Sequence, residues 1–172
     1  MSAAAQSLRQ AQAVGDCARY YACMDALVIR EAKEDDVPAI LDLYRDAELE
    51  VEPAFTVKKA QAHLAVFRRY PSYRIFVAVI EEKIVGTYEL LIMDNLAKGG
   101  RKSGVVEDVA VSPQCRGQGI GRAMMRHARE QCQRAECYKF VLSSNLKRAG
   151  AHAFYESLGF EKHGFSFRVE LA

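Results

Sequence analysis

A strand, a glycine-rich turn and a helix start follow one another between residues 105 and 122, and together they could hold a phosphate. The run Val105–Val111 is apolar and β-branched, as a buried strand requires, and Pro113 ends it because proline cannot donate to a strand ladder. Gly117, Gly119 and Gly121 come next, before residues with helical periodicity. Free N–H groups at a helix N-terminus attract anions, and glycines lack the side chains that would keep a phosphate away. The stretch therefore predicts a site for a phosphate-bearing ligand.

Three glycine-loop patterns can be compared with this turn. A P-loop requires Gly-x-x-x-x-Gly-Lys-Ser/Thr, and the lysine and the hydroxyl are missing here. The dinucleotide pattern Gly-x-Gly-x-x-Gly differs in its spacing. A third pattern, Arg/Gln-x-x-Gly-x-Gly/Ala after a strand, is matched by residues 116–121. The alternative to all three is a helix-start loop whose glycines serve tight packing alone.

The matched pattern resembles the pyrophosphate-binding loop of the GNAT superfamily of acyl-CoA-dependent N-acyltransferases. A second segment, residues 151–160, resembles the family's Ala-x-x-Phe-Tyr-Glu-x-x-Gly-Phe motif. Both motifs stand in the family's order and spacing, and the resemblance extends over residues 27–171. It implies an N-acetyltransferase with acetyl-CoA as co-substrate. Within the superfamily the likeness is greatest to aminoalkylphosphonate and glucosamine-phosphate N-acetyltransferases.

The resemblance also implies where the coenzyme would lie. Its pantetheine arm is expected to pair with the backbone of Val109, Ala110 and Val111, in a gap between this strand and the next one. An N–H near Val109 is expected to stabilise the charge on the acyl oxygen, and Asn145 is expected to contact the arm. The diphosphate is expected on the backbone of Arg116, Gly117, Gln118, Gly119, Ile120, Gly121 and Arg122.

Acyl transfer from a thioester to an amine needs a proton donor for the thiolate and a proton acceptor for the ammonium. The resemblance places Tyr155 beside the thioester, where a phenol with a reference pKa of about 10 suits a general acid; a buried structural tyrosine is the alternative. Strand alternation sends Glu107 and Asp108 to opposite faces, so only one is expected at the acceptor, and Glu107 is favoured as the base over His152. No Cys or Ser nucleophile with a His partner is evident, which favours direct attack by the amine.

The elements that would position these residues alternate in a way that predicts an α+β fold. We expect a single domain with a mixed, mostly antiparallel sheet whose central strands splay, flanked by helices, as the GNAT resemblance also implies. Thr56 is expected to cap a helix, Gly86 to mark a bulge and Gly159 to cap the last helix. The expected strands are 27–32, 74–80, 84–92, 105–111, 138–143 and 165–171, and the expected helices begin near residues 37, 57, 120 and 149.

Composition narrows the class of protein. The chain has 172 residues, of which 50% are hydrophobic and 27% charged, as is usual for one globular domain. Its net charge of +2 is too small to indicate electrostatic binding of nucleic acid. No apolar run reaches the roughly 20 residues of a membrane span. Five cysteines at irregular spacing argue against a disulfide framework and for a reducing, cytoplasmic location; Cys132 is expected in the core, and no zinc spacing is present. Residues 1–26 are predicted to be an N-terminal extension and residues 27–172 the domain.

The acceptor is the least determined part of the prediction. Transfer to the primary amine of a small molecule is favoured; acetylation of a protein N-terminus or lysine, or a CoA-binding regulatory module without turnover, are the alternatives. The resemblance further implies a homodimer, for which the final strand would offer an edge. Basic residues that could hold an anionic acceptor are Lys98, Arg101, Lys102, Lys147 and Arg148, and acidic residues that could sit beside its amine are Glu48, Glu50 and Glu52.

Overall fold

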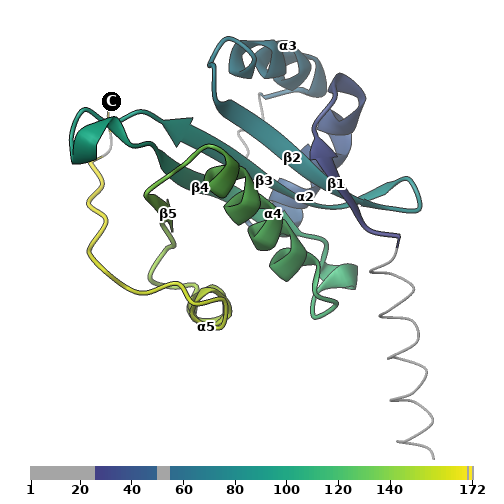
Figure 1. Cartoon of the computed structure of the whole chain (residues 1–172). Coiled ribbons are helices and arrows are strands. Elements are labelled where there is room, and N and C mark those ends of the chain that lie inside the picture. Colours follow the sequence, from purple (N-terminus) through teal and green to yellow (C-terminus); the bar gives the residue numbers. More distant parts are fainter. Residues whose placement is uncertain (1–25, 50–54, 170, 172) are drawn as a thin grey trace, which may run out of the picture.

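A computed structural model describes residues 26–49, 55–169 and 171, so the predictions for residues 1–25, Glu50 and Glu52 lie outside the described residues. The described chain forms one five-stranded sheet in the order β1-β2-β3-β4-β5 (Figure 1). The first four strands are antiparallel to their neighbours, and β5 runs parallel to β4. The predicted α+β fold and mixed sheet are confirmed. The strands are β1 Val28–Glu31, β2 Tyr73–Ile80, β3 Lys83–Met93, β4 Ser103–Val111 and β5 Lys139–Leu142.

Helices cover both faces of the sheet. In Figure 1, α4 lies in front of the strands and α2 lies behind them. Thr56 caps α3 as predicted, because its side chain accepts a hydrogen bond from the Lys59 amide. No helix among the described residues is long and apolar enough to cross a bilayer. The helices are α2 Val37–Asp46, α3 Val57–Phe67, α4 Ile120–Arg134 and α5 Ala149–Glu156, with short 3-10 turns η1 Glu34–Asp36, η2 Lys98–Gly100 and η3 Pro113–Cys115.

The main core lies between α4 and the sheet. Ile120, Met124, Ala128 and Cys132 recur every fourth residue and are at most 3% exposed, so they form a single buried stripe along the helix. They pack with core residues of β3 and β4. Burial of each large apolar side chain contributes about 1.5–3 kcal/mol, so this stripe holds the start of α4 firmly against β4. The prediction that Cys132 is a core residue is confirmed.

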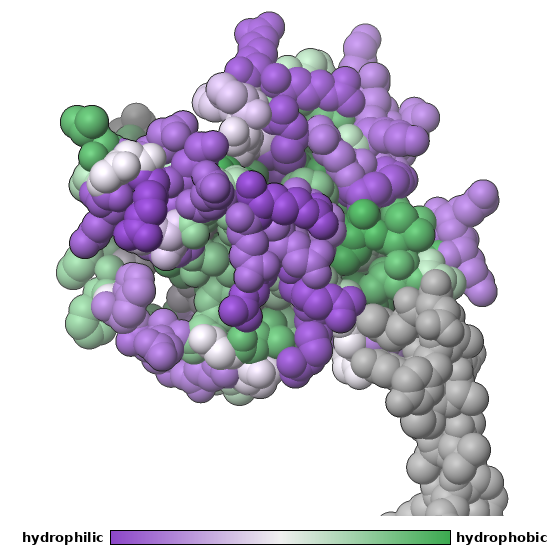
Figure 2. Space-filling view, viewed as in Figure 1, coloured by the Kyte–Doolittle hydropathy of each residue, from purple (hydrophilic) through white to green (hydrophobic). Residues whose placement is uncertain are grey.

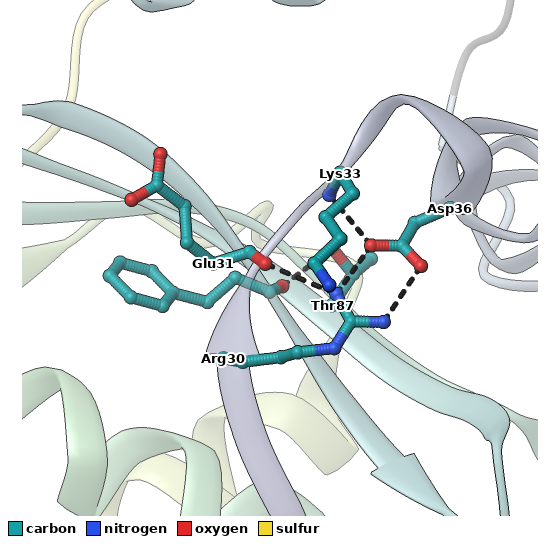
Figure 3. A network of polar contacts seen from close by, with 6 residues as sticks. Arg30, Glu31, Lys33, Asp36 and Thr87 are labelled. Carbon is teal, nitrogen blue, oxygen red and sulfur yellow. Dashed lines mark hydrogen bonds and ion pairs between the residues drawn. The ribbon is translucent and has the colours of Figure 1, made fainter.

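The connection from β1 to α2 is closed by an ion pair (Figure 3). The Arg30 guanidinium donates to both carboxylate oxygens of Asp36, at 2.6 and 2.8 Å. The Lys33 amide donates to the same carboxylate at 2.7 Å. These bonds, led by the one from Arg30, lower the pKa of Asp36 against the opposing effect of burial. The carboxylate at the start of α2 therefore also holds the first strand in place.

Strands β4 and β5 diverge after a short paired region. Residues 103–106 of β4 pair with residues 139–142 of β5, and no β4 residue beyond Val106 has a β5 partner. On its other side β4 continues along β3 to Val111, with an irregularity opposite Thr87 to Glu89. Asp108 lies in this irregularity with a positive φ of 47°. The expected gap between these strands is thus present, and it begins at Glu107.

The predicted final strand, residues 165–171, is wrong for the described part of that segment. Residues 161–169 belong to no helix or strand, and all are exposed. Gly159, whose φ is 84°, ends α5 as predicted, and the chain then leaves the sheet. Alternation of apolar and polar residues identifies a segment able to form a strand, but a strand also needs a neighbour. Within this chain the segment pairs with none of the described strands.

Candidate active site

An open cavity lies along β4 and β5 where these strands diverge. Its volume is about 2890 Å³, more than the roughly 300–1,000 Å³ of a pocket for a drug-sized ligand. Helix α2, strands β3, β4 and β5, and helix α5 all contribute to its walls. Of the predicted site residues, those that line it are Glu107, Val109, Arg122, Asn145 and Tyr155.

The loop before α4 has the backbone that an anion site requires. Gly117 and Gly119 have φ values of 74° and 77°, a region that favours glycine. Gly119 is the N-cap of α4 and makes no side-chain cap, and the position of a Cβ on Gly117 would meet open space. The loop therefore combines left-handed glycines with a helix start that no side chain caps, an arrangement that suits the diphosphate of a coenzyme.

Other residues of the loop have structural contacts that the motif alone does not reveal. A Cβ on Gly121 would lie 3.1 Å from the Phe154 ring, so this glycine lets α4 and α5 approach each other. Ile120 is 1% exposed and belongs to the core, which leaves only its backbone for a ligand. Arg116 donates to the carbonyl oxygens of Val111 and Asp46, both at 3.4 Å, and thereby ties the loop to the ends of β4 and α2. Of the glycines in the loop, Gly121 thus has the tight-packing role that was the alternative to ligand binding.

The loop's two remaining residues, Gln118 and Arg122, make side-chain contacts of their own. Gln118 donates to the Gln114 carbonyl oxygen at 3.0 Å, which braces the turn. The Arg122 guanidinium lies 3.5 Å from the Ser157 hydroxyl and lines the cavity. Arg122 therefore brings a positive charge to the side of the cavity nearest the loop.

The β4 residues expected to hold the pantetheine arm lie beside the gap. Ala110 and Val111 are opposite Thr87 and Gly86 of β3, so β3 occupies one edge of this stretch. Because β5 has already diverged, the other edge of the stretch is not taken up by a described strand. Ala110 is 2% exposed, and Val109 lines the cavity. The geometry is that of a strand able to accept an extended ligand along one side.

Tyr155, on α5, lines the cavity. Its ring contacts the rings of Phe154 and Phe160, with centroids 5.2 and 5.7 Å apart. Burial raises the pKa of Tyr155, with Arg148 acting to lower it and Glu107 to raise it. A raised pKa keeps the phenol protonated at neutral pH, which is the state a proton donor needs.

The regular strand alternation expected at Glu107 and Asp108 is not present, and which of the two faces the acceptor stays a prediction. Glu107 and Asp108 both line the cavity, because the positive φ of Asp108 interrupts the regular alternation of the strand. Burial raises the pKa of Glu107, and the neighbouring Asp108 raises it further. Burial also raises the pKa of Asp108, which Arg148 partly offsets. Because of this bulge, both Glu107 and Asp108 contribute a carboxylate to the cavity, whereas a regular strand would send them to opposite faces.

Three further residues of the cavity, Glu89, Tyr44 and Tyr73, were missed by the sequence interpretation. We call the carboxylates Glu89, Glu107 and Asp108 the acidic wall. Glu89 is 6% exposed and accepts hydrogen bonds from the hydroxyls of Tyr44, at 3.1 Å, and Tyr73, at 2.5 Å. Burial raises the pKa of Glu89 in spite of these bonds. Glu89 lies directly opposite Glu107 on the adjacent strand. The available signal was a glutamate inside an otherwise apolar strand sequence, since buried carboxylates need partners.

Asn145 and His152 have structural partners at the mouth of the cavity. The Asn145 side chain accepts a hydrogen bond from the Lys147 amide at 2.9 Å. The Nε2 atom of His152 lies 3.0 Å from the Asn145 carbonyl oxygen. Both residues line the cavity, but these contacts assign them to the turn between β5 and α5. A contact of Asn145 with the coenzyme stays a prediction.

The basic residues considered for an anionic acceptor separate into two groups. Lys147 and Arg148 line the cavity, and Arg148 donates to the Ala47 carbonyl oxygen at 3.0 Å, which joins α5 to the end of α2. Arg101 instead lies over the Tyr138 ring, 5.4 Å from its centroid. Lys98, Arg101 and Lys102 are not among the residues that line the cavity. In the described ranges no group of three His, Cys, Asp or Glu side chains is arranged to hold a metal.

Comparison with known proteins agrees with this geometry. The model of the acetyltransferase (GNAT) family matches residues 37–160. A glucosamine 6-phosphate N-acetyltransferase of Trypanosoma brucei brucei is 33% identical over 147 residues, which cover 84% of this chain and 96% of the relative. An aminoalkylphosphonate N-acetyltransferase of Salmonella typhimurium is 36% identical over 68 residues, 40% of this chain and 44% of the relative. A solved acetyltransferase structure from Agrobacterium tumefaciens, described as putative in function, superposes with a TM-score of 0.77 at 35% identity, covering 84% of this chain and 99% of the other.

Proposed function

The chain belongs to the acetyltransferase (GNAT) family and is an acyl-CoA-dependent N-acetyltransferase, and we propose that its acceptor is a primary amine of a small molecule that attacks the acetyl group directly. One observation carries this proposal. A proton donor, Tyr155, and three carboxylates, Glu89, Glu107 and Asp108, line a single cavity. That cavity opens where β4 diverges from β5, and the loop before α4 lies at the end of the same β4.

Binding of acetyl-CoA in this proposal uses backbone groups. The amides of residues 116–122 hold the diphosphate, and the free edge of Val109 to Val111 pairs with the pantetheine amides. When bound, the coenzyme supplies an acetyl group activated as a thioester. The side chains of Arg122 and Asn145 flank the arm from either side of the gap.

The reaction assigns one proton transfer to each side of the cavity. Tyr155 donates its phenolic proton to the departing sulfur; a tyrosine is protonated at neutral pH, and burial, which raises its pKa further, leaves it so. Glu107 accepts a proton from the ammonium of the acceptor, directly or through one water. The N–H of Val109 stabilises the negative charge that develops on the acetyl oxygen. The amine then forms the new C–N bond as the C–S bond breaks, without a covalent enzyme intermediate.

The acidic wall gives the acceptor its orientation. Asp108 and Glu89 lie beside Glu107, so an ammonium group is attracted to this end of the cavity. Lys147 and Arg148 line the same cavity and could contact an anionic group at the far end of the acceptor. Relatives named for glucosamine 6-phosphate and for aminoalkylphosphonate have acceptors of that kind, and we propose the same class here. Another relative is named for aminoglycosides, which are cationic amines.

Two finer features complete the proposal. The three described cysteines, Cys115, Cys132 and Cys137, are free thiols, and burial raises the pKa of Cys132 to about 12; thiols without disulfides support a reducing compartment such as the cytoplasm. A homodimer is the oligomeric state we propose. Both features are independent of the assignment of the acetyl-transfer site.

The test is a panel of amines assayed with labelled acetyl-CoA. Glucosamine 6-phosphate, aminoalkylphosphonates, an aminoglycoside, a polyamine and a lysine-containing peptide would be compared by kcat/KM. We expect turnover of at least one small amine, with the peptide the poorest acceptor. CoA binding without turnover of any acceptor would instead support a regulatory module, and peptide acetylation exceeding that of every small amine would support a protein acetyltransferase.

A further inference from the structure

A row of aromatic side chains lines the cavity on the side of α3 and β2. The row consists of Phe55, His63, Phe67 and Tyr73, which we call the aromatic wall. The ring centroid of His63 lies 5.9 Å from that of Phe55 and 5.8 Å from that of Phe67. The centroid of Phe67 lies 4.6 Å from that of Tyr73. Because these distances are those of aromatic contacts, the four rings form one continuous surface.

Helix α3 presents these rings beside its buried face. Ala60 and Leu64 are each 7% exposed and pack against α2, whereas His63 and Phe67, also four residues apart, share another face of the helix. The hydrophobic cores of the described chain do not include Phe55, His63 or Phe67. The part of α3 seen at the top of Figure 2 is mostly hydrophilic. The rings therefore gather at the cavity without filling a core, and exposed apolar side chains that gather in this way mark a binding surface.

The aromatic wall ends at the acidic wall. The Tyr73 hydroxyl donates a hydrogen bond of 2.5 Å to Glu89, and Glu89 lies directly opposite Glu107 on the adjacent strand. Carboxylates attract an ammonium group, so the rings begin where the amine of the acceptor would be held and extend away from that point along β2 and α3. The part of the acceptor next to its nitrogen would then lie against aromatic ring faces.

We propose that the aromatic wall selects acceptors that carry a ring with an apolar face beside the primary amine. This rests on the proposed function and names the body of its acceptor. A ring presents a flat surface to Phe55, His63 and Phe67 and gains the energy of an aromatic contact. An open chain contacts fewer ring atoms and loses more rotational freedom when it binds. Aryl rings and sugar rings both have such a face, so amines of either kind share this chemistry.

The first test compares acceptors that differ in the ring. With acetyl-CoA and the full chain, kcat/KM is measured for phenethylamine against hexylamine, and for glucosamine against its open-chain alditol, glucosaminitol. We expect the ring amine of at least one pair to exceed its open-chain partner by about tenfold, and the pair that shows this preference identifies the kind of ring. Equal values within both pairs would overturn the proposal.

A variant then assigns the preference to the rings. Phe55→Leu/Phe67→Leu keeps apolar side chains but removes two ring faces, so kcat/KM should fall about tenfold for the ring amine and change little for the open-chain amine. The control is Tyr70→Leu, which removes a ring 6.1 Å from that of Tyr73 but outside the cavity lining, and it should keep the preference. Damage to the fold would lower both amines together. A folded double variant that keeps the full preference would overturn the assignment. Phe55→Leu alone, at an exposed position, repeats the test if the double variant does not fold.

Calorimetric titration of the same amines in the presence of CoA separates this selection from acetyl transfer, because binding needs no turnover. Tighter binding of the ring amine to the wild type, lost in the double variant, would support the aromatic wall even if no amine were acetylated, a result that would contradict the proposed function alone. Acetylation of amines with no preference for a ring in binding or in kcat/KM would contradict the aromatic wall alone. A diamine such as putrescine that exceeds every ring amine would also overturn it, because the rings would then bind a second cation.

Discussion

The two ends of the cavity are built in different ways. The coenzyme end is local: residues 109–122 run from β4 through a glycine loop into α4, and the buried stripe of α4 holds them. The acceptor end is assembled from residues distant in the sequence, with Tyr44 on α2, Tyr73 on β2 and Glu89 on β3. A local site can be kept while the distributed wall changes, since one fold can carry different acceptor sites. Substitutions at the two ends should therefore have separable effects.

Tyr155, where the two ends meet, should show the largest effect. We expect Tyr155→Phe to lower kcat by about 10²–10⁴, the usual contribution of a general acid, without weakening CoA binding. Steady-state kinetics and calorimetric CoA titration measure the two quantities. Tyr70→Phe is the control, because Tyr70 is 53% exposed and outside the cavity lining. A Tyr155→Phe enzyme with unchanged kcat would assign this tyrosine to packing.

The coenzyme end should respond to a substitution in its loop. Gly119→Ala places a Cβ where φ is 77° and beside the proposed diphosphate, and strain of roughly 1–3 kcal/mol corresponds to about 10–100-fold weaker CoA binding. Gly100→Ala carries the same kind of strain, at a φ of 76° with open space around it, but lies outside the loop. Titration of both variants with CoA should separate strain at the ligand from strain alone. Equal CoA affinity in the two would contradict the loop assignment.

The acceptor end should respond to removal of one buried charge. We expect Glu89→Gln to lower kcat/KM for the amine about tenfold, the value of one charge-assisted contact of about 1.4 kcal/mol, while CoA affinity is retained. The size and the tyrosine contacts of the side chain are largely preserved. Glu82→Gln, in the exposed β2–β3 turn, is the control. Weaker CoA binding in Glu89→Gln would show that the two ends are not separable.

The smallest effect should be on the pH dependence of stability, where two carboxylates have opposite signs. Burial raises the pKa of Glu89 above its ordinary 4.5, so the folded state holds this proton more tightly, and its contribution to the free energy of unfolding falls as pH rises through that raised pKa. Bonds from Arg30 lower the pKa of Asp36 below its ordinary 3.8. That contribution is present above 3.8 and is lost as pH falls through the lowered value.

Urea unfolding of two variants at a series of pH values measures these slopes. Glu89→Gln should lose the decline in stability above pH 4.5, and Asp36→Asn should lose part of the acid destabilisation below pH 3.8. If both variants follow the wild-type curve after a constant offset, the two carboxylates do not titrate as the structure indicates.

The features predictable from sequence are those encoded by neighbouring residues. The glycine loop, the cap at Thr56, the bulge near Gly86, where the β2–β3 register shifts, and the divergence of β4 from β5 all follow the predicted course. Each depends on a motif or a local backbone preference. The predicted last helix is also present, and Tyr155 on it lines the cavity.

The features that escaped prediction depend on partners far away in the sequence. Glu89 meets Tyr44 and Tyr73 only once the strand register and the position of α2 are known. The alternation rule assumed a regular strand, whereas Asp108 adopts a positive φ, so both acidic residues reach the cavity. The final strand failed for a related reason: alternation shows that a segment could form a strand but not whether a neighbouring edge pairs with it.

A crystal structure with bound CoA tests the central claim most directly. The account predicts diphosphate oxygens within hydrogen-bond distance, about 2.7–3.2 Å, of backbone amides between Arg116 and Arg122, with the sulfur in the gap between β4 and β5 and facing the Tyr155 hydroxyl. A coenzyme bound outside this gap, or a Tyr155 hydroxyl turned away from the sulfur, would contradict it.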